Sequence, residues 1–108
     1  MNINKFTQKS IQAVNDLEKI AYEYGNQEIE EEHLLYCLLN QEDSLILKLI
    51  EKMEINKDEF QRSLIDALNK RPKVSGGQVY IGKDLNRVLV SAEDEAKAMG
   101  DEYVSVEH

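Results

Sequence analysis

The first stretch that could do chemistry is a glycine-rich segment at residues 77–84. It reads Gly-Gln-Val-Tyr-Ile-Gly-Lys-Asp, which follows the G-x-x-x-x-G-K spacing of a phosphate-binding loop up to its last position. Such a loop holds phosphates with backbone N–H groups and needs a serine or threonine after the lysine to bind magnesium. Asp84 stands there instead, with a carboxylate that would lie near the phosphates. We therefore interpret the segment as a loop ending at a helix N-terminus capped by Gly82 or Asp84.

A second candidate is the pair His33 and Cys37, which lie four residues apart and would share one face of a helix. Both residue types bind zinc, but a structural zinc site needs four ligands. No second Cys/His pair of suitable spacing lies nearby. We expect a buried thiol and a histidine packed near the start of a helix, and no metal site.

Three carboxylates, Glu30, Glu31 and Glu32, precede this histidine and raise the question of acid–base catalysis. No candidate nucleophile accompanies them, so the group that they would serve is missing. Carboxylates at a helix N-terminus are stabilised by the helix dipole, which accounts for all three. We expect no catalytic residue and no cofactor in this chain.

The composition narrows the possible partners and environment. The 108 residues carry 13 Lys and Arg against 21 Asp and Glu, a formal net charge of -8. An acidic chain repels nucleic-acid phosphates and anionic membrane surfaces, so neither is an expected partner. One cysteine excludes an internal disulfide and fits a reducing, cytoplasmic setting. No apolar run approaches the roughly 20 residues of a membrane-spanning helix, and no signal core follows the N-terminus.

Residues 1–71 contain one glycine and no proline, which favours long helices. We therefore expect helices to position the candidate residues described above. Apolar residues recur within residues 1–71, and again near the end, at the three- and four-residue spacing of amphipathic helices. We expect five helices. The first runs from Thr7 to Gly25, the second starts near Glu30, and the third starts after Asp43 or Ser44. The fourth runs from Asn56 to Arg71, before Pro72, and the fifth runs from about Leu85 to Gly100. The intervening loop contains Gln78–Ile81, which has strand propensity but is too short for a sheet by itself. The predicted fold class is all-α.

The chain also repeats itself after about 75 positions. Identical residues share that register, namely Glu18 and Glu93, Ala21 and Ala96, Gly25 and Gly100, Glu32 and Glu107, and His33 and His108. The register predicts a pseudo-twofold duplicated helical repeat within one domain, residues 1–108. Repeat one would span about 1–70, a linker about 71–82, and a partial repeat two about 83–108. His33 leads into a further helix whereas His108 is the last residue, so we expect a truncated second repeat with an exposed helix face.

Residues in this register resemble a known family. The segments Asn4–Thr7, Gly25–Ile29 and Glu32–Leu35 look like the first Clp N-terminal repeat, and Gly100–His108 looks like the matching part of the second. The link 71–77 and the segment 84–86 look more like ClpB than ClpC.

The resemblance implies an all-helical domain at the N-terminus of a homo-hexameric AAA+ chaperone, with ATP and magnesium bound only outside this chain. It implies capture of unfolded or aggregated polypeptide through an apolar groove. In the ClpB family, positions matching Thr7, Asp101 and Glu107 are linked to substrate handling, and the same residue types stand here. Each also fits a purely structural role, as a cap or a helix-end residue.

The leading hypothesis is a substrate-binding module of a ClpB-type disaggregase, a chaperone of the stress response. One alternative is the adaptor- or substrate-docking domain of a ClpC-type unfoldase that works with a peptidase. Another is a free-standing helical interaction domain. Acidic residues around an apolar groove would favour peptides that carry both basic and apolar side chains.

Overall fold

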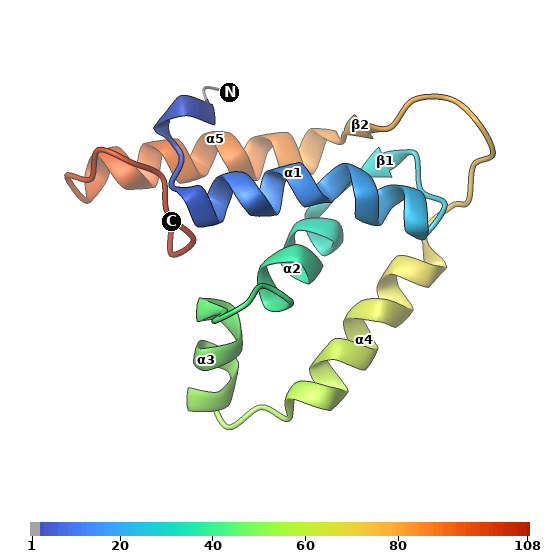
Figure 1. Cartoon of the computed structure of the whole chain (residues 1–108), viewed down its shortest axis with the longest axis horizontal. Helices are drawn as coiled ribbons and strands as arrows, with labels where there is room; N and C mark the ends of the chain where they lie inside the picture. Colours follow the sequence, from blue (N-terminus) through green and yellow to red (C-terminus); the bar gives the residue numbers. More distant parts are fainter. Residues whose placement is uncertain (1–2) are drawn as a thin grey trace.

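Five α-helices make up most of the molecule in the computed structural model, which describes residues 3–108 (Figure 1). A helical turn, η1 (Ile3–Lys5), precedes them. The helices are α1 (Gln8–Glu23), α2 (Glu31–Leu39), α3 (Leu45–Lys52), α4 (Lys57–Lys70) and α5 (Lys83–Ala98). Two short strands, β1 (Glu28–Ile29) and β2 (Tyr80–Ile81), lie before α2 and α5. The predicted all-α class is confirmed.

The helix starts follow from local hydrogen bonds that the sequence predicts. Oγ1 of Thr7 accepts from the N–H of Ser10, and Oγ of Ser44 accepts from that of Leu47. Oδ1 of Asn56 accepts the N–H groups of the second and third residues of α4. Each bond satisfies a donor that the first turn of a helix leaves unpaired. Ser44, rather than Asp43, is therefore the cap of α3.

The duplicated repeat is visible in the geometry of α1 and α5. Each helix has 16 residues, and the bounds of α5 are those of α1 shifted by 75 positions. Gly25 and Gly100 follow the two helices with φ of 69° and 75°, values that favour glycine at a helix C-terminus. The two helices run in opposite directions in Figure 1. This matched geometry supports the predicted pseudo-twofold arrangement.

The two strands pair in parallel, so the segment with predicted strand propensity, Gln78–Ile81, is not alone but has a partner strand that the sequence analysis did not name. Glu28 lies opposite Tyr80, and Ile29 lies opposite Ile81. The N–H of Gly82 donates to the carbonyl of Ile29 at 2.7 Å. The partner strand lies 52 residues earlier in the chain, and only the packing of the helices brings the two segments together.

A related contact joins the other ends of α1 and α5. Phe6 and Val104 form a parallel bridge, and the N–H of Thr7 donates to the carbonyl of Val104 at 2.9 Å. In the repeat register, Phe6 corresponds to Ile81 and Val104 corresponds to Ile29. Ile29 and Ile81 pair with each other in the two-stranded sheet. The repeat symmetry therefore relates the two backbone links between the halves.

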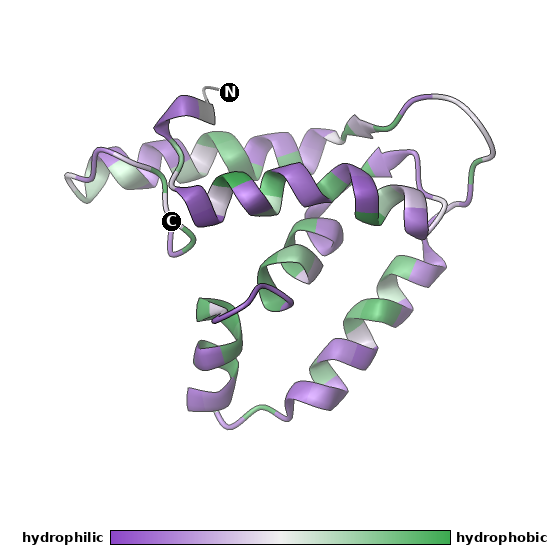
Figure 2. Ribbon diagram, viewed as in Figure 1, coloured by the Kyte–Doolittle hydropathy of each residue, from purple (hydrophilic) through white to green (hydrophobic). Residues whose placement is uncertain are grey.

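The apolar side chains form two clusters. In Figure 2, green and purple segments alternate along the helices, as expected for amphipathic helices. The larger cluster joins α1, α2 and α5 with the two backbone links. Its buried members are Phe6, Ala13, Leu17, Ala21, Ile29, Cys37, Leu85, Leu89, Ala96 and Val104. The smaller cluster, Leu39, Ile50 and Leu64, joins α2 to α3 and α4. The first cluster therefore holds the two halves together, while the second attaches the α3–α4 arm.

The expected exposed face lies on α5. Val88 is 39% exposed, whereas Ala13 at the equivalent position of α1 is 1% exposed, because α2 packs on α1. Val90 on α5 is also exposed, at 47%. Within residues 3–108, none of the helices has the length and apolar character needed to cross a membrane.

Candidate binding site

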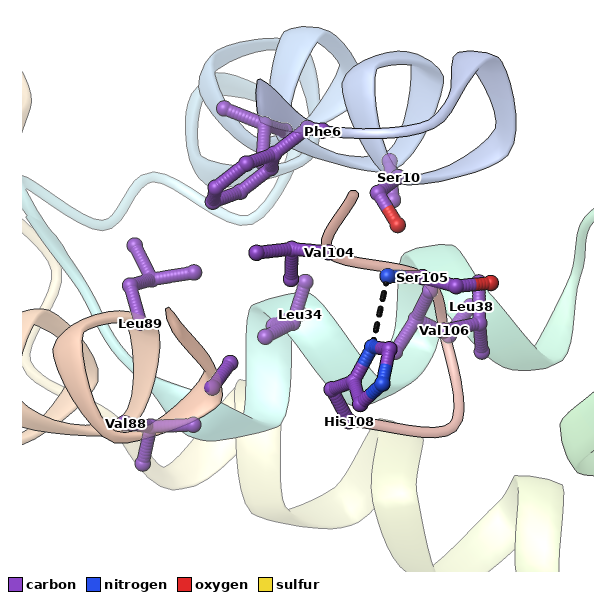
Figure 3. A pocket seen from close by; sticks show the side chains of 13 residues that line it. Phe6, Ser10, Leu34, Leu38, Val88, Leu89, Val104, Ser105, Val106 and His108 are labelled. Carbon is purple, nitrogen blue, oxygen red and sulfur yellow. Dashed lines mark hydrogen bonds between the residues drawn. The ribbon is translucent and has the colours of Figure 1, made fainter. Parts of the chain in front are cut away.

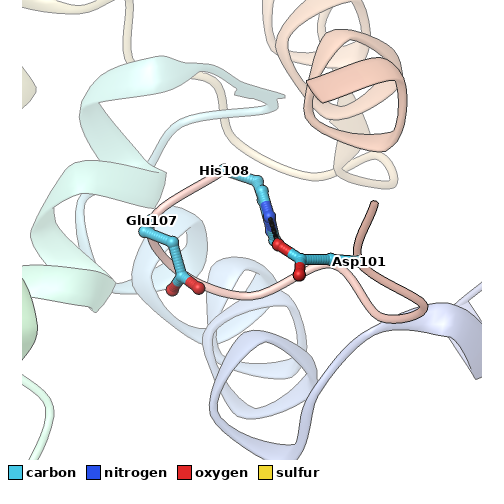
Figure 4. Close-up of side chains that lie close together, drawn as sticks. All are labelled: Asp101, Glu107 and His108. Atoms are coloured by element: carbon cyan, nitrogen blue, oxygen red, sulfur yellow. Dashed lines mark hydrogen bonds and ion pairs between the residues drawn. The ribbon is translucent and has the colours of Figure 1, made fainter. Parts of the chain in front are cut away.

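A closed loop after α5 brings two of the predicted site residues together. Gly100 ends the helix, and the chain turns back so that the N–H of His108 donates to the carbonyl of Ser105 at 3.1 Å. The N–H of Ser105 donates to Nδ1 of His108 at 2.9 Å. On the other side of the ring, Nε2 lies 2.8 Å from Oδ2 of Asp101 (Figure 4). Polar atoms of Asp101, Glu107 and His108 lie within 4.8 Å of one another.

The loop presents negative charge to solvent. The side chain of Asp101 is 45% exposed, and Glu107 is exposed beside it. A hydrogen bond from the Ser105 hydroxyl lowers the pKa of Glu107, followed by smaller contributions that include its own backbone N–H and the nearby His108. Hydrogen bonds to the charged form stabilise it, so Glu107 is ionised at neutral pH. We call Asp101 and Glu107 the acidic pair.

Thr7 lies near this loop but uses its side chain elsewhere. Its Oγ1 accepts from the N–H of Ser10 at 3.4 Å and donates to Oγ of Ser10 at 3.1 Å, so both bonds cap the start of α1. Its link to the loop is the backbone hydrogen bond to Val104. The structure thus brings Asp101 and Glu107 side by side and places Thr7 one strand bridge away.

An apolar pocket of about 150 Å³ lies against the loop that carries the acidic pair (Figure 3). Residues of α1, α2, α5 and the loop line it, including Phe6, Leu34, Leu38, Val88, Val104 and Val106. Ser105 and His108 also line the pocket, so the loop forms one of its walls. A cavity of this size accommodates one small apolar group, such as a phenyl ring. The site therefore combines one apolar pocket with a loop that carries two carboxylates and contributes His108 to the pocket wall.

The sequence interpretation missed Ser105, Val106 and His108 as site residues. The available signal was the repeat itself, because Ser105 and His108 occupy the positions of Glu30 and His33. The N–H of Glu30 donates to Nδ1 of His33 in the same way, at 2.9 Å. The repeat register therefore relates the two loops, although the hydrogen bonds that close them are seen only in the structure.

The Asp101–Glu107–His108 cluster has the residue types of a metal site, but its hydrogen bonding favours another arrangement. The N–H of Ser105 can only donate, so Nδ1 accepts, and the single proton of a neutral ring lies on Nε2. Nε2 then donates to Asp101. A metal at Nε2 would need the proton on Nδ1, where it would face the N–H of Ser105. The ring is thus committed to holding the loop closed.

The earlier chemical candidates have structural roles. Both ring nitrogens of the buried His33 are hydrogen-bonded, Nδ1 to Glu30 and Nε2 to Asn26 at 3.0 Å. Cys37 is buried, and burial raises the pKa of its thiol to about 12. Gly82 is the N-cap of α5. The buried carboxylate of Glu30 lies against that helix start, in the region that a phosphate-binding loop would offer to phosphate.

The duplicated helical fold, with an apolar pocket beside paired carboxylates, places the chain among small all-helical domains built from two related halves. The model of the Clp repeat (R) N-terminal domain family matches residues 5–108. The chain belongs to this family, as the resemblance of its two repeats predicted.

Curated relatives agree with the family match. The chain is 45% identical over 113 residues to the chaperone protein ClpB of Nitratidesulfovibrio vulgaris and 41% identical over 108 residues to ClpB of Porphyromonas gingivalis. Both matches cover 100% of this chain but only 13% and 12% of the relatives. The chain therefore spans about one eighth of their length.

Solved structures share the fold at low sequence identity. The N-terminal domain of the ClpV1 ATPase of Escherichia coli superposes with a TM-score of 0.85 at 22% identity, over 94% of this chain and 63% of that one. The N-terminal domain of Hsp104 from Candida albicans gives 0.85 at 19% identity, over 94% and 67%. A chain from a structure named for a peptide of the SciI protein gives 0.88 at 22% identity, over 98% and 68%.

Proposed function

We propose that this domain captures unfolded or aggregated polypeptide for a ClpB-type AAA+ disaggregase. The observation that carries the proposal is the apolar pocket lined by His108, whose ring is hydrogen-bonded to Asp101 and lies close to Glu107. Its relatives at 45% and 41% identity are ClpB chaperones, which supports the choice of this type over a ClpC-type unfoldase. ATP hydrolysis, magnesium binding and hexamer formation would then belong to parts of the parent protein outside this chain.

The geometry suits an extended segment with little sequence preference. Burial of one apolar side chain in the pocket is non-directional and depends on the area removed from water. The carboxylates of Asp101 and Glu107 would attract a lysine or arginine of the same segment, and the formal net charge of -8 would favour its approach. Segments that carry both apolar and basic side chains should therefore bind best.

Binding of an adaptor protein at the same site is the second candidate. The observation that favours it is the fold match to the structure named for a SciI peptide, because a peptide is a defined partner rather than an unfolded chain. A defined partner would bind one sequence much more tightly than its scrambled versions. An unfolded-client site would bind both with similar affinity.

Fluorescence anisotropy with a labelled, unstructured peptide of leucine, phenylalanine and lysine tests the proposal. Val88→Asp places a charge in the pocket wall and should abolish measurable binding. Val90→Asp is the matched control, because Val90 is also an exposed valine on α5 but does not line the pocket. Equal effects of the two changes, or no binding by the unaltered chain, would refute the proposed site.

A further inference from the structure

Two histidines make the same pair of hydrogen bonds at equivalent places in the two repeats. Nδ1 of His33 accepts the N–H of Glu30 at 2.9 Å, and Nε2 lies 3.0 Å from Oδ1 of Asn26. Nδ1 of His108 accepts the N–H of Ser105 at 2.9 Å, and Nε2 lies 2.8 Å from Asp101. Each ring thus closes a loop that begins just after a helix-ending glycine.

The surroundings of the two rings differ in charge and exposure. In repeat one, Asn26 is uncharged and buried, and its Nδ2 donates to the carbonyl of Pro72 at 3.2 Å. Glu32, the counterpart of Glu107, is paired with Arg71 at 2.6 Å. In repeat two the histidine instead holds a carboxylate that is 45% exposed, next to the exposed Glu107. The first loop is internally neutralised, whereas the second presents its charge outward.

We infer that His108 is a positioning residue for partner binding, because its ring lines the apolar pocket and holds the carboxylate of Asp101 beside Glu107. This inference rests on the proposed function. The ring acts through Asp101, whose other lone pairs stay available to a basic group of the partner. A carboxylate already fixed in place loses less side-chain entropy when the partner binds.

His108 also couples the two parts of the site. Its side chain is only 1% exposed, yet its ring lines the pocket, so an apolar group in the pocket packs against the residue that fixes Asp101. A peptide whose apolar and basic side chains are adjacent would engage both parts through one rigid loop. The first repeat lacks this property, since its corresponding carboxylate is already paired with Arg71.

Two conservative substitutions separate the two hydrogen bonds. In a capping box, a glutamine three residues after the N-cap accepts the N–H of the N-cap residue. His108→Gln should therefore keep the hydrogen bond from the N–H of Ser105 but lose the hydrogen bond to Asp101. Asp101→Asn should keep the loop closed and lose the charge, because Asn26 fills the same role in repeat one. His33→Gln is the matched control for a structural effect of the same change.

The test is a double-mutant cycle, read by anisotropy with the leucine–phenylalanine–lysine peptide. Asp101→Asn should weaken binding about two- to fivefold, the range for one exposed ion pair. His108→Gln should weaken it by a similar factor and should add little in the Asp101→Asn background, because no charge is left to position. His33→Gln should lower thermal stability without changing the affinity.

The outcomes separate this inference from the proposed function. If Asp101→Asn weakens binding but His108→Gln does not, the positioning role is wrong and the capture site stands. The same conclusion follows if the fold-changes of the two single variants simply multiply in the double variant. If the unaltered chain does not bind, both fail. Nitrogen shifts of the ring, measured by NMR without any ligand, should place the proton of the neutral His108 on Nε2. A proton on Nδ1 would also overturn the role.

Discussion

A Cβ atom added to Gly82 would lie 1.6 Å from Oε1 of Glu30. The carboxylate at the start of α2 therefore occupies the space that any larger residue at the start of α5 would need. Gly82 has a φ of -70°, which every residue adopts easily, so glycine is needed here for contact rather than for backbone freedom. The repeat partners of these two residues are Thr7 and Ser105, a larger residue opposite a smaller one.

This contact predicts that Gly82→Ala destabilises the domain by about 1–3 kcal/mol, the usual cost of overpacking. Glu30→Ser should relieve most of that cost, because serine stands opposite the larger residue in the other repeat. Chemical denaturation of the two single variants and the double variant measures the coupling. Additive effects would mean that Glu30 simply moves aside.

The same carboxylate predicts an unusual pH dependence. Burial raises the pKa of Glu30, helped by the charges of Glu28 and Asp84 and opposed by a backbone hydrogen bond from Leu85 and by Arg71. The folded state therefore binds the proton more tightly than the unfolded state, so this contribution to stability is full below the ordinary pKa of 4.5 and is lost as the pH rises through the folded pKa.

Glu30→Gln should accordingly gain stability relative to the unaltered chain as the pH rises above 4.5, measured by denaturation at several pH values. Glu31→Gln, an exposed change one residue along, is the control and should run parallel to the unaltered chain. A constant difference for Glu30→Gln would contradict the raised pKa.

The pKa of Glu107 is shifted in the opposite direction, so its contribution to stability depends on pH in the opposite sense. The Ser105 hydroxyl lowers the pKa of Glu107, so this contribution to stability is present above the ordinary value of 4.5 and is lost as the pH falls through the folded pKa. Ser105→Ala should raise the pKa of Glu107 in a carbon-detected NMR titration. Ser105→Thr, which keeps the hydroxyl, should leave it low, and a similar rise in both variants would exclude the hydroxyl as the cause.

The ion pair between Arg71 and Glu32 should stabilise the domain more than the exposed ion pair between Arg87 and Asp84. The guanidinium of Arg71 lies 2.6 Å from Glu32 with both side chains largely covered, at 24% and 32% exposure, and it ties the end of α4 to the start of α2. Arg71→Gln should cost about 1 kcal/mol. The exposed pair Arg87–Asp84, at 3.6 Å, is the control, and Arg87→Gln should change the free energy of unfolding very little. Equal losses would show that burial adds nothing.

Much of the fold follows from short-range signals in the sequence. The caps Thr7, Ser44 and Asn56 bond to groups within three residues, and Pro72 ends α4 through its effect on Arg71, whose ψ is 150°. These interactions depend on local chemistry alone, so the helix starts were predictable. The repeat register was equally visible, and it marks residues 101–108 as a copy of residues 26–33, which lead into α2.

The acidic pair was named from the resemblance, but its geometry required the tertiary structure. Nothing in the spacing of Asp101, Ser105 and Glu107 says that one histidine ring closes their loop or that the loop forms a pocket wall. The pocket needs α1, α2 and α5 to meet, and the β1–β2 pairing needs segments 52 residues apart to adjoin.

The sequence by itself determined the helices, their caps and the duplication, because each depends on residues within a few positions or on a repeated pattern. Only the tertiary structure decided that Arg71 neutralises Glu32 and that Glu107 is left exposed. These outcomes depend on which side chains come within bonding distance of one another. The packing of the helices decides this, and short-range sequence signals do not specify how the helices pack.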